Sequence, residues 1–253
     1  MRSIFILAGL LAALACPAAA SAVVGGTAVK PGAYPFAAAI GDAKGSYYCG
    51  GTLIAPNVVL TAAHCLTERR VALTDLRVLI GTGNATGVAA VALHPKFEPQ
   101  SMRYDAALVI LDGATTGVRT LPMAASSPLA GTTVTAAGWG KTSENATTTP
   151  AQLRKVVLKV GTTSTCNRGN TSRGTYFAPS MLCASNPGRD TCSGDSGGPL
   201  VATSGGHTAL VGITSFGDGC ARPGHPGVYT RVAAIRGWVL AQVKLVEAAQ
   251  LGA

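Results

Sequence analysis

The sequence contains few charged residues, few aromatic residues and no long run of basic residues. Of its 253 residues, 12% are charged and 5% are aromatic, whereas 47% are hydrophobic. This hydrophobic share is ordinary for a globular protein and argues against a disordered chain. The formal net charge of +9 comes from lysines and arginines that stand singly, apart from Arg69-Arg70. A dedicated nucleic-acid-binding surface is therefore not predicted.

The spacing that metal sites require is also missing. The sequence has no Cys-x-x-Cys and no His-x-x-x-His motif, and such motifs supply the paired ligands of common zinc sites. We therefore expect no metal and no cofactor. His94, His207 and His225 have no partner at catalytic or metal-binding spacing, so we interpret them as structural or surface residues.

Residues 1–22 carry the features of a secretory signal peptide. Arg2 precedes an apolar stretch over residues 4–15, and Ala20-Ser21-Ala22 provides an A-x-A cleavage site. The apolar stretch is too short to span a bilayer, and no stop-transfer charges follow it. We therefore expect a secreted, extracellular protein without a membrane anchor, whose mature chain covers residues 23–253.

The cysteines of the mature chain predict a disulfide framework. The sequence has seven cysteines, and removing Cys16 with the signal peptide leaves six. An even number of cysteines in an exported chain predicts three disulfide bonds, but sequence alone does not choose among the pairings. The six residues are Cys49, Cys65, Cys166, Cys183, Cys192 and Cys220.

Short β-rich runs, such as those at 88–93 and 107–111, are separated by turn residues along the mature chain. Many short strands without intervening helical patterns predict an all-β sandwich or barrel. The exception is an apolar stripe of helical period at about 235–250, which predicts a C-terminal helix. We place the seam between two halves of similar size at residues 120–127.

The segment Gly194-Asp195-Ser196-Gly197-Gly198-Pro199 places a serine between glycines. Glycine permits a sharp turn and brings backbone amides close to a substrate carbonyl group. The same letters satisfy the G-x-S-x-G nucleophile elbow of α/β-hydrolases, for which Asp218 and His225 would supply the later acid and histidine. That fold needs a long helix after the serine, whereas Pro199 and strand-like residues follow here. The α/β-hydrolase is therefore the weaker alternative.

Two further motifs precede the serine: Thr61-Ala62-Ala63-His64-Cys65 and Tyr104-Asp105-Ala106-Ala107-Leu108. With these motifs, and with Val23-Val24-Gly25-Gly26, the chain resembles the trypsin and chymotrypsin family of serine peptidases from Val23 to Val239. The resemblance implies two six-stranded antiparallel β-barrels, at about 23–122 and 123–234, followed by the C-terminal helix. It also implies the disulfides Cys49–Cys65, Cys166–Cys183 and Cys192–Cys220.

The same resemblance implies a catalytic triad. Ser196 would be the nucleophile, His64 the general base, and Asp105 the residue that holds the imidazole. The backbone amides of Gly194 and Ser196 would form the oxyanion hole. The alternative from another class is a non-catalytic homologue that acts as a binding or inhibitory protein. Such homologues typically lose a triad residue, and this sequence keeps all three.

Asp190, six residues before the nucleophile, stands where this family has the floor of the primary specificity pocket. A buried carboxylate there favours arginine or lysine in the substrate. The remaining implied pocket residues are Thr191, Ser215, Gly217 and Gly227, and Ser215 and Gly217 would also pair with the substrate backbone. We expect a monomeric endopeptidase that cleaves polypeptides after Arg or Lys and that protein protease inhibitors can bind.

In this family a freed N-terminal amine pairs with the aspartate before the nucleophile, which implies the pair Val23 and Asp195. The signal cleavage site falls directly before Val23, so export itself would release the active enzyme. Signal cleavage after Ala20 is the alternative, and it would leave Ser21-Ala22 as a short propeptide. Because Ala22 precedes Val23, cleavage there by the enzyme itself is not expected.

Some positions depart from familiar members of the family. Phe216 stands where tryptophan is usual and Ser193 where glutamine is common, so the outer subsites are expected to differ. The loop at 81–91 lacks acidic residues, and the calcium site of the family is therefore expected to be absent. Sequons begin at Asn84, Asn145 and Asn170, although such triplets often arise by chance.

Overall fold

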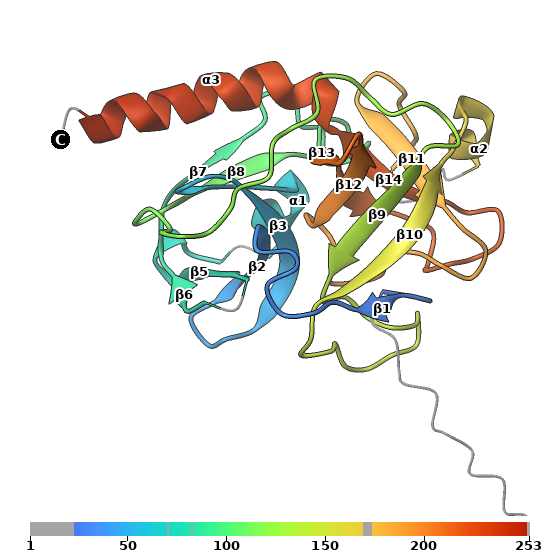
Figure 1. The fold of residues 1–253 in the computed structure, drawn as a ribbon, viewed down its shortest axis with the longest axis horizontal. Helices are drawn as coiled ribbons and strands as arrows, with labels where there is room; N and C mark the ends of the chain where they lie inside the picture. Colours follow the sequence, from blue (N-terminus) through green and yellow to red (C-terminus); the bar gives the residue numbers. More distant parts are fainter. Residues whose placement is uncertain (1–22, 70, 82, 169–173, 252–253) are drawn as a thin grey trace, which may run out of the picture.

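The computed structural model of the protein describes residues 23–69, 71–81, 83–168 and 174–251. The predicted signal peptide, with Cys16, and the sequon at Asn170 lie outside these ranges. The described chain folds into two sheets and three α-helices, with one short 3-10 turn, η1 (Leu73–Asp75) (Figure 1).

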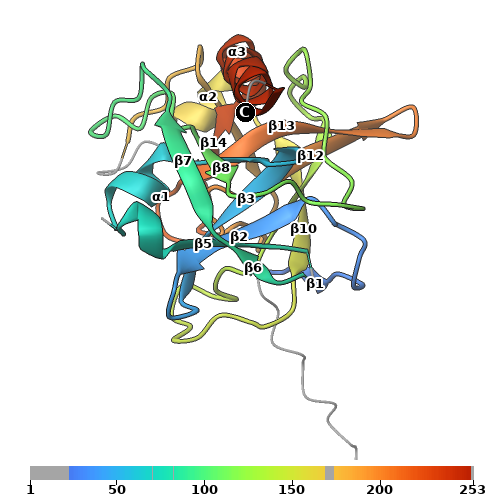
Figure 2. The ribbon, with the colours of Figure 1, turned by 90° about the vertical axis from the view of Figure 1, so that its left-hand side faces the viewer.

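The first sheet contains seven strands in the order β6-β5-β2-β3-β4-β8-β7, and all neighbours are antiparallel. Figure 2, in which this sheet faces the viewer, shows the strands crossing one another as the sheet curls. Large side chains such as Ile40, Leu60 and Leu108 are fully buried inside the curl. The strands are β2 (Ala37–Asp42), β3 (Tyr47–Ala55), β4 (Val58–Thr61), β5 (Leu76–Ile80), β6 (Ala85–Thr86), β7 (Val88–Leu93) and β8 (Ala107–Leu111).

The second sheet closes on itself. Strand β9 pairs with both β10 and β12, so that β9 to β14 form a ring of six strands, and β1 adds to the outside of β10. Closing the ring leaves no free edge among these six strands. The strands are β1 (Thr27–Ala28), β9 (Thr133–Gly138), β10 (Arg154–Val160), β11 (Met181–Ser185), β12 (Pro199–Ser204), β13 (His207–Phe216) and β14 (Gly227–Arg231).

The longest helix is α3 (Val232–Leu251), and it corresponds to the predicted C-terminal helix. It follows β14 in the sequence, and Ile235 and Val239 are buried in a core cluster that contains residues of the first sheet and also Val201, Leu210 and Ile213 of the second. Figure 1 shows α3 running past β7 and β8. The helix therefore packs on a core cluster that the two sheets share. No helix in the described ranges is both long and apolar enough to cross a bilayer.

The all-β prediction, with a trypsin-like arrangement and a C-terminal helix, is confirmed. The six-stranded barrel of the second half closes, whereas the first half is a curled sheet of seven strands. Strand β1 belongs to the first half by sequence but pairs in the second sheet. The division of the chain near residue 122 stays a prediction.

Three disulfide bonds stabilise this arrangement, and they join the pairs that the resemblance implied. Cys49–Cys65 links β3 to helix α1 (Ala63–Thr67), and Cys166–Cys183 links α2 (Thr163–Asn167) to β11. Cys192–Cys220 joins the loop after β11 to the loop after β13. Each bond restricts the unfolded chain and thereby stabilises the folded one, typically by about 2–4 kcal/mol.

Of the three histidines expected to be structural, His94 is buried. Its ring stacks on Tyr104 at 5.1 Å and meets the edge of Trp238 at 4.8 Å between centroids. Burial lowers the pKa of His94 below its ordinary value, with a further lowering from Lys96. This aromatic contact links α3 to the segment that leads into β8.

Candidate active site

His64 and Asp105 come together because β4 and β8 are neighbours. Thr61 at the end of β4 pairs with Ala107 at the start of β8, so the residues just beyond each strand end lie side by side. The Oδ2 atom of Asp105 is 2.7 Å from Nδ1 of His64, and Oδ1 accepts the backbone N–H of His64 at 2.9 Å. The carboxylate therefore fixes both the position and the ring orientation of His64.

Asp105 is fully buried and accepts hydrogen bonds from side chains of both neighbouring strands, β13 and β14. Ser215 donates its hydroxyl to Oδ2 at 2.5 Å, and Thr230 donates to the Asp105 carbonyl oxygen at 2.7 Å. With Nδ1 of His64 donating to the carboxylate, Nε2 of the neutral ring is left as a proton acceptor. Sequence reasoning assigned Ser215 only to substrate binding and missed Thr230, because a threonine inside a strand carries no distinguishing signal.

Ser196 lies in the turn before β12 and is half-buried. Its carbonyl oxygen accepts the N–H of Gly50 at 2.6 Å. The Sγ atom of Cys65 lies 3.7 Å from this same carbonyl oxygen and 3.8 Å from Nε2 of His64. Ser196 and the imidazole therefore flank one disulfide sulfur, at the boundary between the two sheets.

The backbone on either side of the serine requires glycine. Gly194 has a φ of +98°, in a region that side chains disfavour, and a β-carbon there would lie 3.1 Å from Cα of Gly140. Among the hydrogen bonds of the described residues, none uses the N–H of Gly194 or Ser196 as a donor. These two amides are therefore left for a ligand oxygen, as an oxyanion hole requires.

Asp195 is fully buried beneath this turn. Its two carboxylate oxygens accept the N–H groups of Gly140 and Cys192, each at 2.8 Å. Burial raises the pKa of Asp195 to about 7, and the two hydrogen bonds only partly oppose this. Val23 is also fully buried, but in the full chain its nitrogen belongs to a peptide bond, so the pair of Val23 with Asp195 stays a prediction.

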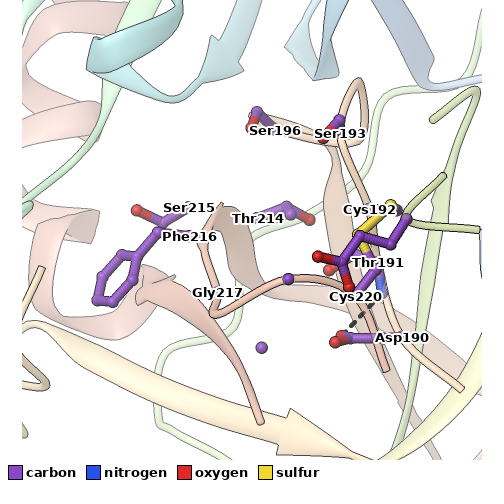
Figure 3. A pocket seen from close by; sticks show the side chains of 13 residues that line it. Asp190, Thr191, Cys192, Ser193, Ser196, Thr214, Ser215, Phe216, Gly217 and Cys220 are labelled. Carbon is purple, nitrogen blue, oxygen red and sulfur yellow. Dashed lines mark hydrogen bonds between the residues drawn. A yellow bond between two sulfur atoms is a disulfide. The ribbon is translucent and has the colours of Figure 1, made fainter. Parts of the chain in front are cut away.

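A cavity of about 270 Å³ extends from Ser196 to Asp190. Figure 3 shows the two residues well separated, with the cavity residues between them. The remaining residues that line it are Glu144, Thr191, Cys192, Ser193, Thr214, Ser215, Phe216, Gly217, Gly219, Cys220 and Gly227. All of the pocket residues expected from the sequence therefore surround one cavity.

Asp190 is the buried carboxyl group of this cavity, with 3% of its surface exposed. Its Oδ1 atom accepts the N–H of Thr191 at 2.8 Å, and Oδ2 accepts that of Ala221 at 3.0 Å. Burial raises the pKa of Asp190 to about 7, against the lowering effect of these hydrogen bonds. A cation in the cavity would favour the ionised form and would itself be stabilised.

The glycines of the cavity keep it open. A β-carbon on Gly227 would lie 2.8 Å from Oδ1 of Asp190, and one on Gly217 would lie 3.9 Å from Cα of Gly227. Gly217 and Gly227 therefore lie next to each other in the cavity wall, where β13 and β14 are paired. A larger residue at either position would reduce the width available to a long side chain.

Two sequence alternatives do not survive the geometry. Ser196 is followed by β12 rather than by a long helix, which excludes the α/β-hydrolase interpretation. Cys49, His64 and Cys65 form the group closest to a metal site in the described ranges. The two sulfur atoms are bonded to each other, so they are not thiolate ligands.

Three residues that line the cavity were not predicted, namely Glu144, Thr214 and Gly219. Glu144 lies in the loop between β9 and β10, far in sequence from the other lining residues. Its side chain contacts Arg222, which lies in the loop between β13 and β14. An isolated glutamate in a polar loop carries no sequence signal, so only the folded chain reveals its place.

Comparison with known proteins agrees with this geometry. The trypsin family model matches residues 23–239. The chain is 36% identical over 233 residues to Hypodermin-B of Hypoderma lineatum, covering 88% of each chain. It is 38% identical to Trypsin alpha-4 of Lucilia cuprina, covering 86% of each chain. It is also 37% identical to a trypsin of Saccharopolyspora erythraea, covering 87% of this chain and 98% of that one.

A match of this extent, together with the fold, decides the class of protein. The chain belongs to the trypsin family of serine peptidases and is a serine endopeptidase.

Proposed function

We propose that this endopeptidase is secreted and hydrolyses polypeptides after arginine or lysine residues. The observation that carries the specificity is the buried carboxyl group of Asp190 in the cavity beside Ser196. A neutral side chain would leave an ionised Asp190 unpaired in a poorly solvated place, whereas a guanidinium or ammonium group would compensate it. Several similar relatives carry the name trypsin, which supports the same preference.

Ser196, His64 and Asp105 act as the catalytic triad in this proposal. His64 removes the proton of the Ser196 hydroxyl as its Oγ attacks the substrate carbonyl carbon, and His64 then gives that proton to the leaving amine. Water hydrolyses the acyl-enzyme by the same sequence and regenerates Ser196. The 2.7 Å contact with Asp105 supports this role, because it orients the ring and stabilises its protonated form.

The amides of Gly194 and Ser196 stabilise the negative charge on the tetrahedral intermediate. Each such donor typically contributes roughly 3–4 kcal/mol to the transition state. The positive φ of Gly194 supports this assignment, since it turns the amide away from the regular backbone. The backbone of Ser215 and Gly217 pairs with the substrate as an added strand.

Export supplies the activation step. Signal cleavage before Val23 frees an amine that pairs with Asp195, and the buried state of both residues supports this partnership. A carboxyl group whose pKa is raised by burial gains most from a nearby cation. In the alternative, the signal peptide is cleaved after Ala20, and another peptidase must then remove the short propeptide Ser21-Ala22. The enzyme acts as a monomer and is a target for protein protease inhibitors.

The specificity is tested by assaying the purified secreted protein on four matched peptide amides ending in Arg, Lys, Phe or Ala at the cleaved bond. We expect kcat/KM for the Arg and Lys substrates to exceed that for Phe and Ala by at least about a hundredfold. A preference for the Phe substrate would show that Asp190 does not recognise the substrate side chain.

A further inference from the structure

Three charged side chains and a histidine form a network beside the specificity cavity. Arg222 donates to both carboxylate oxygens of Glu144, at 3.0 and 2.5 Å, and to Oδ1 of Asp218 at 2.9 Å. The other oxygen of Asp218 lies 3.0 Å from Nδ1 of His225. We call Glu144, Arg222, Asp218 and His225 the rim network. Its centre is a guanidinium group held by two carboxylates.

The rim network joins two separate loops. Glu144 belongs to the loop between β9 and β10, whereas the other three residues belong to the loop between β13 and β14. The backbone amide of Cys220 also lowers the pKa of Glu144. In the described chain, the other hydrogen bonds from the start of the β9–β10 loop to its surroundings run from Gly140 to Asp195 and from Lys141 to Ser193. Glu144 therefore fastens the outer part of this loop.

The network reaches the wall of the cavity through Glu144. Glu144, Gly219 and Cys220 all line it. A β-carbon on Gly219 would meet Nε of Arg222 and would lie 2.6 Å from Oε2 of Glu144. Gly219 has a φ of +66°, so glycine is favoured here both by the backbone and by the ion pair packed on it. The cavity wall and the ion pair are therefore one packed unit.

The ion pair stays charged across the neutral pH range. The hydrogen bond from Arg222 lowers the pKa of Glu144, and Glu144 raises the pKa of Arg222. Exposed ion pairs usually add little to the free energy of unfolding. A two-pronged arginine–carboxylate contact, however, specifies geometry as well as attraction. The rim network is thus suited to holding the β9–β10 loop and the β13–β14 loop in a fixed position relative to each other.

We propose that Arg222 is a positioning residue for the specificity cavity. By holding Glu144 and Asp218, it keeps the β9–β10 loop against the β13–β14 loop and so sets the width of the entrance. This inference rests on the proposed function, in which the cavity receives the substrate side chain. Arg222 itself contacts neither the reacting atoms nor Asp190 through any hydrogen bond in the described part of the chain.

A double-mutant cycle tests this proposal. Glu144→Gln, Arg222→Met and the double variant are compared with the wild type on the amide substrate that the wild type cleaves best. We expect each single change to raise KM by roughly two- to tenfold with kcat within about twofold, because an altered entrance weakens binding rather than chemistry. The KM of the double variant should be no higher than the higher KM of the two single variants, since both single changes remove the same contact between Glu144 and Arg222.

Benzamidine, a small aryl amidinium, provides a second readout that does not depend on turnover. Its inhibition constant should rise in the same variants, in parallel with KM. Arg119→Met is the matched control, because Arg119 is an exposed arginine outside this cavity and its loss removes the same charge. Thermal unfolding of every variant should stay close to the wild type.

The outcomes separate this proposal from the proposed specificity. KM values of both single variants equal to that of Arg119→Met, or additive effects in the double variant, would overturn the positioning role while leaving Arg and Lys preference intact. A wild type that prefers Phe substrates would instead overturn the specificity. Because the cycle uses the best wild-type substrate, coupling between Glu144 and Arg222 is measured in either case.

Discussion

Gly227 and Asp190 are packed so closely that a β-carbon on Gly227 would lie 2.8 Å from the Oδ1 atom of Asp190. Gly227→Ala should therefore push the carboxylate aside and narrow the cavity. We expect kcat/KM for Arg and Lys substrates to fall by roughly ten- to a hundredfold, with the larger loss for the bulkier arginine. Gly113→Ala, where a β-carbon meets nothing within 4 Å, is the control. Unchanged kinetics in Gly227→Ala would mean that the substrate side chain does not reach this depth.

Removing the proposed nucleophile should abolish turnover without unfolding the protein. The Ser196 side chain is half-buried and appears in no packed core cluster, so Ser196→Ala creates little strain. We expect kcat to fall by about 10⁶-fold, with a residual rate from binding and the oxyanion hole. Steady-state assays and a thermal melt of the same sample measure both properties. Turnover near the wild-type value would assign the nucleophile elsewhere.

Asp190→Ser should remove the preference for cationic side chains. Losing one partner of a buried charge pair costs about 2–5 kcal/mol, which is roughly 30- to 5,000-fold in kcat/KM for the Arg and Lys substrates. Hydrolysis of the Ala substrate should change little, because that side chain does not reach Asp190. An equal loss on both classes of substrate would indicate general damage to the site rather than lost recognition.

Benzamidine binding should depend on pH through Asp190. The pKa of Asp190 is raised to about 7 by burial, and only the ionised carboxylate attracts an amidinium. Affinity should therefore be constant above about pH 8 and fall by up to about tenfold for each pH unit below 7. His64→Ala should keep this profile. A profile that becomes flat in His64→Ala would assign the titration to the histidine.

The same pKa shift affects folding stability with a defined sign. Because the folded-state pKa of Asp190 lies above the ordinary value of 3.8, folding favours the protonated acid. Asp190 therefore contributes to the free energy of unfolding at low pH, and this contribution is lost as the pH rises from about 4 to 7. Asp190→Asn should remove this part of the pH dependence, which thermal melts across this range would reveal.

An extended N-terminus should prevent activation. A protein that begins one residue before Val23 would have its amine displaced from Asp195, and we expect its kcat/KM to be at least about a hundredfold lower. N-terminal sequencing of each preparation must accompany the assay, because trimming would restore the wild-type start. Full activity in a preparation whose N-terminus remains extended would remove the basis for this pairing.

The sequence by itself predicted the features that depend on local backbone chemistry. The even number of cysteines in an exported chain predicts disulfides from composition alone, wherever the cysteines stand. Glycines around Ser196 predict a sharp turn, because that signal is confined to a few neighbouring residues. The short β-rich runs predicted the all-β fold for the same reason. The resemblance to the family then predicted the cysteine pairing and the place of Asp190, which spacing alone left open.

Only the tertiary structure decided which distant residues meet. His64 and Asp105 are 41 residues apart and touch because β4 pairs with β8. Glu144 and Arg222 are 78 residues apart, and neither residue carries a signal that predicts the other. The curled form of the first sheet and the support of Asp105 by Thr230 are equally absent from local patterns. Contacts of this kind depend on how strands pair and sheets pack, and no single segment of the chain contains that information.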